Sequence, residues 1–330
     1  MDRNEFGYEL PETAIAQRPF EPRDGARLLV DRGPQRSPRH GFVSDLPELL
    51  SPGDLLVVND TRVRPARLQL HKETGAAVEI LLLEARPGDE WDALVRPARR
   101  VRPGMTLRGP GVRVTVVEDL GEGRRRVAVT GDAAAVGEIP LPPYIRGTLD
   151  DPERYQTVYA RRPGSVAAPT AGLHLTHEVL ERCRRQGIDV APLELDVGLD
   201  TFRPITAPHL DDHEMHSEAY NVPADTLAAC DAAHAGGGRV IAVGTTVVRA
   251  LEAAAASGQR EGRTNLFIRR GYRFRLVDGL LTNFHLPRTT LLVLVDAFIG
   301  PRWRDLYTAA LAEGYRFLSF GDAMLLERRP

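Results

Sequence analysis

Cysteine is scarce in this sequence, and its scarcity excludes several classes of protein. Cys183 and Cys230 are the only cysteines among 330 residues, and they lie far apart, without the paired spacing of a zinc site. A disulfide framework is therefore not expected, and a cytoplasmic location is. The first residues lack a basic segment followed by an apolar one, so we expect no signal peptide. No stretch approaches the roughly 20 apolar residues that a membrane span requires, so we expect no membrane partner.

Lysine is almost absent as well. Lys72 is the only lysine, so nearly every positive charge is an arginine, and the formal net charge is −2. This balance argues against a protein that coats nucleic acid. Arginine suits bidentate contact with phosphate, although a solvated surface is the simpler explanation for any single arginine cluster. An RNA partner stays one alternative because arginines cluster at residues 96–102, 124–126, 161–162 and 269–275.

Three common catalytic motifs are also missing. The sequence has no G-x-x-x-x-G-K-[S/T] loop for nucleoside triphosphates, no G-x-G-x-x-G dinucleotide fingerprint and no G-x-S-x-G elbow for a serine nucleophile. Nucleotide hydrolysis, nicotinamide chemistry and serine hydrolysis are therefore disfavoured.

The apolar pattern changes twice along the chain. At both ends, apolar runs typical of buried strands, such as residues 54–58, 166–168 and 239–243, alternate with helical patterns. This alternation predicts a mostly parallel sheet with covering helices. The helical patterns lie at residues 176–186, 223–235, 246–256 and 291–299.

The middle of the chain has a different period. Short strand patterns at residues 67–70, 78–83, 91–95, 112–117 and 126–129 are separated by Gly and Pro turns, without a helix of useful length. This spacing is typical of a small antiparallel barrel. We therefore predict an α/β protein with an inserted small antiparallel β-barrel. The predicted bounds are 1–62 and 151–330 for the α/β domain and 63–150 for the barrel domain.

Polar segments follow three of the predicted strands, where ligands commonly bind in α/β proteins. At the third segment, a helix start with free N–H groups can bind a carboxylate or a phosphate. Each segment also has a simpler explanation, as an Asx turn, a structural histidine or an ordinary helix cap. The candidates are Asn59, Asp60, Thr61 and Arg62; Thr170, Gly172 and His174; and Gly244, Thr245 and Thr246 with Arg249 nearby.

Residues 282–287 interrupt sequence that otherwise reads as core. Asn283 and His285 lie between the apolar runs 276–281 and 291–295. Burying either side chain without a hydrogen-bond partner costs roughly 1–3 kcal/mol, so neighbouring groups must satisfy them. The segment is thus either a buried turn with internally paired polar groups or one wall of a ligand site.

A histidine cluster invites a metal interpretation. His209, His213 and His216 lie among acidic residues, but neither H-E-x-x-H nor a complete tetrahedral ligand set is present. Proton transfer or hydrogen bonding to a substrate is the preferred interpretation. A metal-dependent hydrolase that uses these three histidines remains an alternative.

Taken together, the motifs resemble one known family, the S-adenosylmethionine:tRNA ribosyltransferase-isomerases of queuosine biosynthesis. The resemblance spans almost the whole chain, and so many unusual words in one order exclude chance similarity. The words are YELP (8–11), IAQ (15–17), GDLLVVNDTRV (53–63), YQTVY (155–159), AAPTAGLH (167–174), Gly198 with TF (201–202), HEMHSE (213–218), VGTT (243–246), VD (277–278) with TNFHLP (282–287), YRF (315–317) and GDAM (321–324).

This resemblance implies a reaction and its partners. The ribosyl part of S-adenosylmethionine is transferred to 7-aminomethyl-7-deazaguanine at the wobble position of tRNA and rearranged, giving epoxyqueuosine and releasing adenine and methionine. The implied tRNAs have GUN anticodons and accept aspartate, asparagine, histidine or tyrosine. S-adenosylmethionine is a consumed substrate, no metal or other cofactor is implied, and a monomer is expected. The family's fold, an α/β domain with an inserted β-barrel, agrees with the change of period near residue 63.

The chemistry suggests roles for particular residue types. The sulfonium acidifies its C5′ proton, so His174, His213 or His216 can be the base, while Asp322 or His285 can protonate or hydrogen-bond the leaving adenine. The methionine carboxylate can bind the 244–246 loop near Arg249. A non-catalytic RNA-binding protein is the remaining alternative, and the intact histidine words disfavour it. The expected pocket is completed by Asn59, Asp60, Thr61, Arg62, Thr170, Gly172 and Asn283.

Several positions depart from the family pattern. Asp196 stands where a His is usual in a His-Val-Gly word, and Asp200 stands where a Gly is usual. These two acids flank Gly198 and place in doubt a catalytic role for the missing histidine. The other departures are Val247 for Ser, Arg269-Arg270 for Tyr-Pro and Asp296 for Ser.

Overall fold

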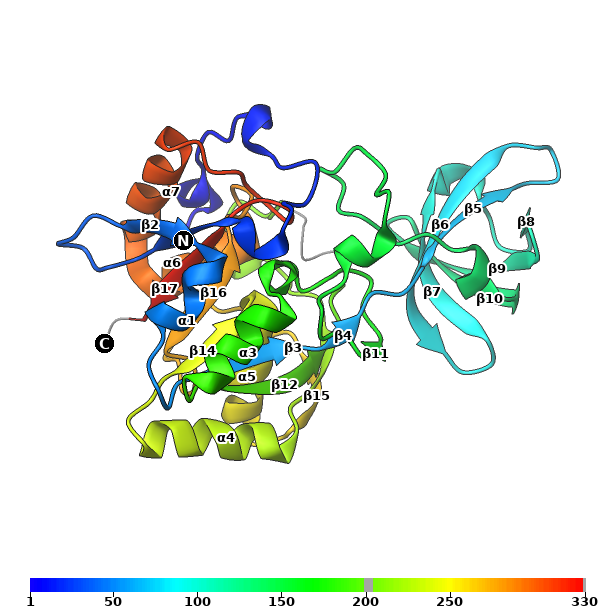
Figure 1. Ribbon diagram of the computed structural model, residues 1–330. Coiled ribbons are helices and arrows are strands. Elements are labelled where there is room, and N and C mark those ends of the chain that lie inside the picture. Colours follow the sequence, from blue (N-terminus) through cyan, green and yellow to red (C-terminus); the bar gives the residue numbers. More distant parts are fainter. Residues whose placement is uncertain (199–203, 329–330) are drawn as a thin grey trace. The chain divides into compact units, whose positions relative to one another are not determined.

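The computed structural model describes residues 1–198 and 204–328, and it divides into two compact units (Figure 1). The first unit comprises residues 1–62, 142–162 and 168–330, and the second comprises residues 63–141 and 163–167. That residues 63–150 form a separate domain within an α/β domain of 1–62 and 151–330 stays a prediction. Asp200 and the TF word at 201–202 lie outside the described residues.

A mixed sheet forms the centre of the first unit, and nine of its strands lie in the described part of the chain. The buried strands carry the apolar runs seen in the sequence. In the strand Leu55–Asn59, for example, all five residues are buried. In spatial order the strands are β15 (Glu261–Thr264), β13 (Glu218–Asn221), β12 (Asp189–Leu195), β3 (Leu55–Asn59), β14 (Val240–Val243), β16 (Gly279–Asn283), β17 (Ala323–Glu327), β1 (Arg27–Val30) and β2 (Arg39–Phe42).

The sheet was predicted to be mostly parallel, but only half of its described strand pairs are parallel. Parallel pairs join β12 to β3, β3 to β14, β14 to β16 and β17 to β1. Antiparallel pairs join β15 to β13, β13 to β12, β16 to β17 and β1 to β2. Three of the strands in antiparallel pairs, β2, β13 and β15, are four residues long and polar, so no apolar run predicts them. The described fold is therefore mixed α/β.

Helices pack against this sheet, and four of them begin within one residue of a predicted start, whereas the helix at Trp303–Ala312 was not predicted. Thr176 caps α3 by accepting the N–H of Val179, and Thr289 caps α6 by accepting the N–H of Leu292. Helices α1 and α3 share a core cluster with β3, β14 and β16, while α5 packs against β12, β3 and β14. The helices are α1 (Leu46–Leu49), α3 (His177–Arg185), α4 (Ala224–Ala235), α5 (Thr245–Ser257), α6 (Thr290–Ile299) and α7 (Trp303–Ala312).

Both cysteines lie in these helices, Cys183 in α3 and Cys230 in α4, and both thiols are free and buried. Burial raises the pKa of the Cys183 thiol to about 11 and that of the Cys230 thiol to about 12. Among the described residues no helix is long and apolar enough to cross a bilayer.

The second unit is a closed antiparallel barrel with the strand order β10-β7-β6-β5-β8-β9. Five of these strands coincide with predicted ones, and alternate apolar residues such as Leu68 and Leu70 are buried inside. The sixth, β8, was not predicted because its sequence, TLRG, contains a single leucine. The strands are β5 (Arg67–His71), β6 (Ala77–Arg86), β7 (Glu90–Arg96), β8 (Thr106–Gly109), β9 (Val112–Gly121) and β10 (Arg124–Gly131), followed by α2 (Ala133–Val136).

The strand predicted at residues 166–168 is wrong. This segment bends and leads through Pro169 into the 3-10 helix η7 (Thr170–His174), because proline cannot donate a ladder hydrogen bond. Two-residue strands lie at β4 (Thr61–Arg62) and β11 (Arg162–Pro163).

Candidate active site

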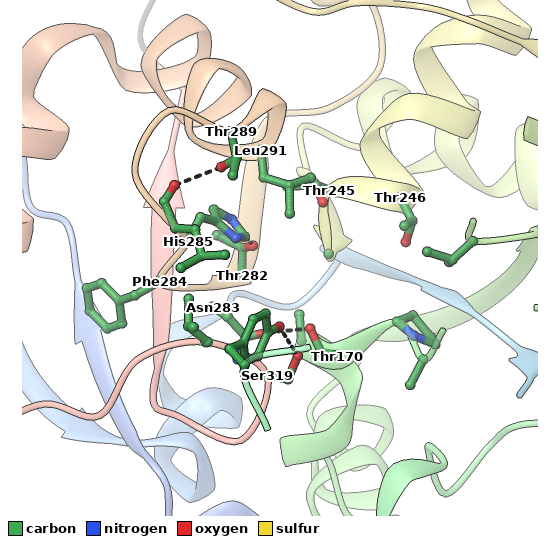
Figure 2. A pocket seen from close by; sticks show the side chains of 18 residues that line it. Thr170, Thr245, Thr246, Thr282, Asn283, Phe284, His285, Thr289, Leu291 and Ser319 are labelled. Atoms are coloured by element: carbon green, nitrogen blue, oxygen red, sulfur yellow. Dashed lines mark hydrogen bonds between the residues drawn. The ribbon is translucent and has the colours of Figure 1, made fainter. Parts of the chain in front are cut away.

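A pocket lies at the carboxyl ends of β14 and β16 in the first unit (Figure 2). Its volume is about 560 Å³, counted with its open mouth. Three segments far apart in the sequence meet there: the start of η7, the start of α5 and the turn after β16. The structure thus brings together Thr170, Gly244, Thr245, Thr246, Asn283 and His285, which the sequence singles out.

The turn after β16 is held in place by aromatic packing. Phe284 stacks on Phe317 with ring centroids 4.5 Å apart and meets Tyr307 edge to face at 5.2 Å. The N–H of His285 donates to the hydroxyl oxygen of Tyr307 at 2.9 Å, and the hydroxyl of Tyr8 donates to the His285 carbonyl at 2.5 Å. The backbone N–H and carbonyl of His285 are therefore both hydrogen-bonded, and its side chain lines the pocket.

Asn283 links the turn to η7. The hydroxyl of Thr170 donates to Asn283 Oδ1 at 2.9 Å, and Asn283 Nδ2 lies 2.9 Å from His174 Nε2 (Figure 2 shows the first bond). Because the amide nitrogen can only donate, His174 Nε2 accepts and its other nitrogen carries the proton. Burial, together with Arg316, Arg23 and Arg154, lowers the pKa of His174 to about 4. His174 is therefore neutral, and the lone pair on its Nε2 already accepts the hydrogen bond from Asn283.

His285 is neutral as well. Its Nε2 lies 3.1 Å from the hydroxyl of Thr282, and burial lowers its pKa to about 3. The internal pairing expected of a buried turn is confirmed, and residues of the same segment also line a pocket. That this pocket holds a ligand stays a prediction.

Because His174 and His285 are buried and neutral, we expect the free energy of unfolding to depend on pH. An unfolded histidine titrates near 6.5, whereas the folded-state pKa values are about 4 and about 3. The unfolded state therefore binds more protons, and stability is lost as the pH falls below 6.5, by about 1.4 kcal/mol per pH unit for each histidine. Urea unfolding between pH 7 and pH 5 measures this slope. The His174→Gln variant should show a shallower slope, and an unchanged slope would contradict the assignment.

The start of α5 offers hydrogen-bond donors to the pocket. Gly244 precedes the helix with φ 97°, a conformation that favours glycine, and Thr245 and Thr246 line the pocket (Figure 2). The first amides of a helix have no intrahelical partner. The buried hydroxyl oxygen of Thr246 also lacks a hydrogen-bond partner among the described residues. This end of the pocket therefore suits a carboxylate or another acceptor group.

The described residues that line the pocket carry no charged side chain. They include no Asp, Glu, Lys or Arg, and burial raises the pKa of Tyr144, whose hydroxyl lies 2.6 Å from that of Ser319 (Figure 2). Hydroxyl groups, an amide and apolar carbons suit a nucleoside.

A second hollow shares Leu291 with the pocket as a lining residue. His216 and Arg249 line it together with Phe267. His213 packs edge to face on Phe267 with ring centroids 5.5 Å apart, and burial followed by His216 lowers the pKa of His213. Sequence reasoning missed a buried carboxylate beside this hollow, Glu218, which forms an ion pair with Arg249. A glutamate on a strand with a polar pattern gave no signal of burial.

The segment after β3 lies elsewhere and does not line the pocket. Asn59 exchanges hydrogen bonds with the Leu195 backbone, at 2.9 Å from Nδ2 and 3.3 Å to Oδ1, and also accepts the N–H of Thr61. Asp60 is buried, which raises its pKa, and Arg62 forms an ion pair with Glu153. Their place in a substrate site stays a prediction.

Asp322 and Gly172 also lie outside the described lining. Both carboxylate oxygens of Asp322 accept backbone N–H groups, from Arg27 at 2.8 Å and Arg316 at 2.7 Å, although burial raises the pKa of Asp322. A β-carbon at position 172 would clash with the Tyr159 hydroxyl, so only glycine fits there. Both residues therefore have structural tasks, and a catalytic role for Asp322 stays a prediction.

His209, His213 and His216, the histidines of the hydrolase alternative, do not form a metal-binding cluster in the described structure. Within residues 1–198 and 204–328, no three His, Cys, Asp or Glu side chains are placed to hold a metal ion. His209 forms a backbone bridge with Asp2, whereas His216 is turned toward Glu218.

Two departures from the family pattern contact each other. Arg270 donates to both oxygens of Asp296 at 3.1 Å, and the Trp303 indole N–H donates to the same buried carboxylate at 3.0 Å. We expect Asp296→Ala to lower the free energy of unfolding by roughly 1–3 kcal/mol, because it leaves a buried indole N–H unpaired. Urea titration measures the loss. The exposed Asp305→Ala is the matched control, and equal stability of the two variants would contradict the argument.

Known proteins are similar to this chain over nearly its whole length. A family model described as queuosine biosynthesis protein matches residues 3–326. An S-adenosylmethionine:tRNA ribosyltransferase-isomerase from Rubrobacter xylanophilus is 53% identical and covers 99% of this chain and 98% of its own. One from Thermus thermophilus is 52% identical over 97% of this chain and 98% of its own. A crystal structure of an S-adenosylmethionine tRNA ribosyltransferase from Thermotoga maritima is 37% identical, covers 97% and 99% of the two chains, and has a TM-score of 0.57.

Proposed function

This chain belongs to the queuosine biosynthesis protein family, and from that premise we propose that its pocket holds the S-adenosylmethionine consumed in the reaction. The reaction is that of an S-adenosylmethionine:tRNA ribosyltransferase-isomerase, and its product is epoxyqueuosine. One observation supports the location. Three words of the family, at 167–174, 243–246 and 282–287, are more than 30 residues apart, yet residues of each line one pocket.

Within this pocket, the start of α5 binds the methionine carboxylate. Its free amides and the Thr246 hydroxyl supply donors, and the helix dipole favours an anion there. Arg249 supports this end indirectly, because Glu218 already neutralises its guanidinium. The hydroxyl-rich remainder of the pocket holds the nucleoside.

We assign the removal of the C5′ proton to His216, which lines the hollow that shares Leu291 with this pocket. His174 has its accepting nitrogen bonded to Asn283, and His285 contacts Thr282 and has a pKa of about 3. His216 is 21% exposed and has a carboxylate as hydrogen-bond partner, which suits a proton acceptor. His213, which packs on Phe267, is the second choice.

His285 hydrogen-bonds the leaving adenine. Of the two candidates for this role, His285 lines the described pocket, whereas Asp322 holds two backbone amides. A neutral imidazole can support the departing base by a hydrogen bond without carrying a charge.

The tRNA partner carries a GUN anticodon, and exposed arginines of the barrel contact its phosphates. Arg96, Arg99, Arg100 and Arg102 are all exposed at the end of β7 and in the loop that follows. No ion pair with a carboxylate joins these four among the described residues, in contrast to Arg86 and Arg126 of the same barrel. Unpaired arginines suit phosphate contacts that position an RNA without reading its sequence. The enzyme acts as a monomer.

Adenine release tests this function. The purified protein is incubated with S-adenosylmethionine and tRNA that carries the aminomethyl base, and we expect adenine and methionine in equal amounts, together with epoxyqueuosine in the tRNA. The control tRNA carries unmodified guanine at the wobble position. The absence of adenine with the correct tRNA would overturn the proposal.

A further inference from the structure

Glu218 is almost completely buried, and it is joined to groups from different parts of the chain. Its side chain is 2% exposed. Its Oε1 accepts His216 Nε2–H at 3.0 Å and the N–H of Gly198 at 3.1 Å, while its other oxygen pairs with Arg249. Burial by itself would raise the pKa of Glu218, but Arg249, His216 and Gly198 hold it at about 2. The group is therefore a carboxylate at neutral pH.

This carboxylate is rigidly held. Arg249 is itself fixed by the Leu266 carbonyl at 3.2 Å and the Thr264 carbonyl at 3.4 Å. An ion pair buried this deeply costs desolvation free energy, so a hydrophobic pair of the same shape would serve stability equally well. Its presence beside a histidine therefore calls for an explanation other than stability.

The ion pair is also connected to two walls of the proposed substrate pocket. Val197 lines that pocket, and the next residue, Gly198, donates to Glu218. On the other side, Thr245 and Thr246 line the pocket, and Arg249 lies one turn further along α5. Two pocket walls are thus tied to one carboxylate.

We propose that Glu218 is a positioning residue that orients His216 as the base. A carboxylate can only accept, so it fixes the proton on Nε2 and leaves the lone pair of Nδ1 free. The C5′–H bond of S-adenosylmethionine breaks, its electron pair stays on the carbon beside the sulfonium, and its proton moves to Nδ1. Glu218 then faces the imidazolium and stabilises its charge. The inference rests on the proposed function and adds a residue to it.

Kinetics of Glu218→Gln and Glu218→Asp test the inference. Among the described residues, the other titratable or charged groups that face His216 are Arg249 from α5 and His213 from its own segment, and the α6 residues that line the hollow carry no charge. We expect Glu218→Gln to lower kcat for adenine release at least about 10-fold and to move the acidic limb of kcat/KM to lower pH, with partial recovery in Glu218→Asp. In the His216→Ala background, Glu218→Gln should cause no further loss. Additive losses or an unmoved limb would overturn the inference.

Nitrogen-15 NMR of the parent enzyme gives a second measurement that needs no folded variant. We expect neutral His216 to be protonated on Nε2, and protonation on Nδ1 would overturn the inference. The tautomer also separates two failures. If the parent enzyme shows His216 protonated on Nε2 but the His216→Ala variant keeps full activity, the hydrogen bond to Glu218 is present and His216 is not the base. That result would overturn both the assignment of the base and the inference.

Discussion

The His216→Ala variant is expected to release adenine about 100- to 10,000-fold more slowly than the parent enzyme at saturating tRNA and S-adenosylmethionine. General bases contribute roughly this range of rate, and alanine cannot accept the C5′ proton. Single-turnover release of radiolabelled adenine measures the chemical step without product release. Because the His216 ring is hydrogen-bonded to Glu218 alone among the described side chains, the variant should still bind both substrates.

Two comparisons separate chemistry from folding in this experiment. The exposed His71 of the barrel provides the matched histidine-to-alanine control, which should keep the parent rate. Added imidazole should restore part of the lost rate in His216→Ala, because it can occupy the space of the deleted ring. A rate within threefold of the parent would exclude His216 as the base and leave His213 as the remaining candidate.

Gly172→Ala should destabilise the first unit by roughly 3 kcal/mol, although it adds a single methyl group. A β-carbon at position 172 would lie 2.0 Å from the Tyr159 hydroxyl oxygen and 3.0 Å from Thr157 Cγ2. Thr157 and the Tyr159 hydroxyl are buried, so the added methyl group must displace the half-buried Tyr159 side chain. Urea unfolding followed by circular dichroism measures the loss.

Removing the obstructing atom should restore part of this stability. The buried Tyr159 hydroxyl has no hydrogen-bond partner among the described residues, so Tyr159→Phe by itself should change stability little. The double variant should be more stable than Gly172→Ala, and strict additivity would contradict the steric explanation. Gly147→Ala is the matched control, because a β-carbon there meets nothing within 4 Å.

The apolar pattern predicted the parts of the fold that are held together by burial. The runs at 54–58 and 239–243 became β3 and β14, and the helix patterns that follow Thr176 and Gly244 became α3 and α5. Short polar strands such as β13 and β15 were not predicted, because their pairing depends on backbone hydrogen bonds that leave no apolar pattern. The parallel proportion of the sheet was overestimated for the same reason.

The sequence predicted which segments meet at the pocket better than it predicted which of their residues line it. Thr170, Thr245 and Asn283 were selected as neighbours of strand ends, and all three line the pocket. The sequence could not show that Arg249 is neutralised by Glu218, because the partners are 31 residues apart and meet through tertiary packing. Nor could it distinguish four histidines whose chemistry depends on what each ring nitrogen contacts.

The two buried thiols make the natural chain a convenient background for chemical labelling. Maleimides and related reagents attack the thiolate, and at neutral pH almost none forms in groups with pKa values of about 11 and about 12. A cysteine introduced at an exposed barrel position outside the arginine cluster, such as Thr74, would therefore react selectively. A fluorophore placed there would report tRNA binding in the otherwise unaltered enzyme, without prior replacement of Cys183 or Cys230.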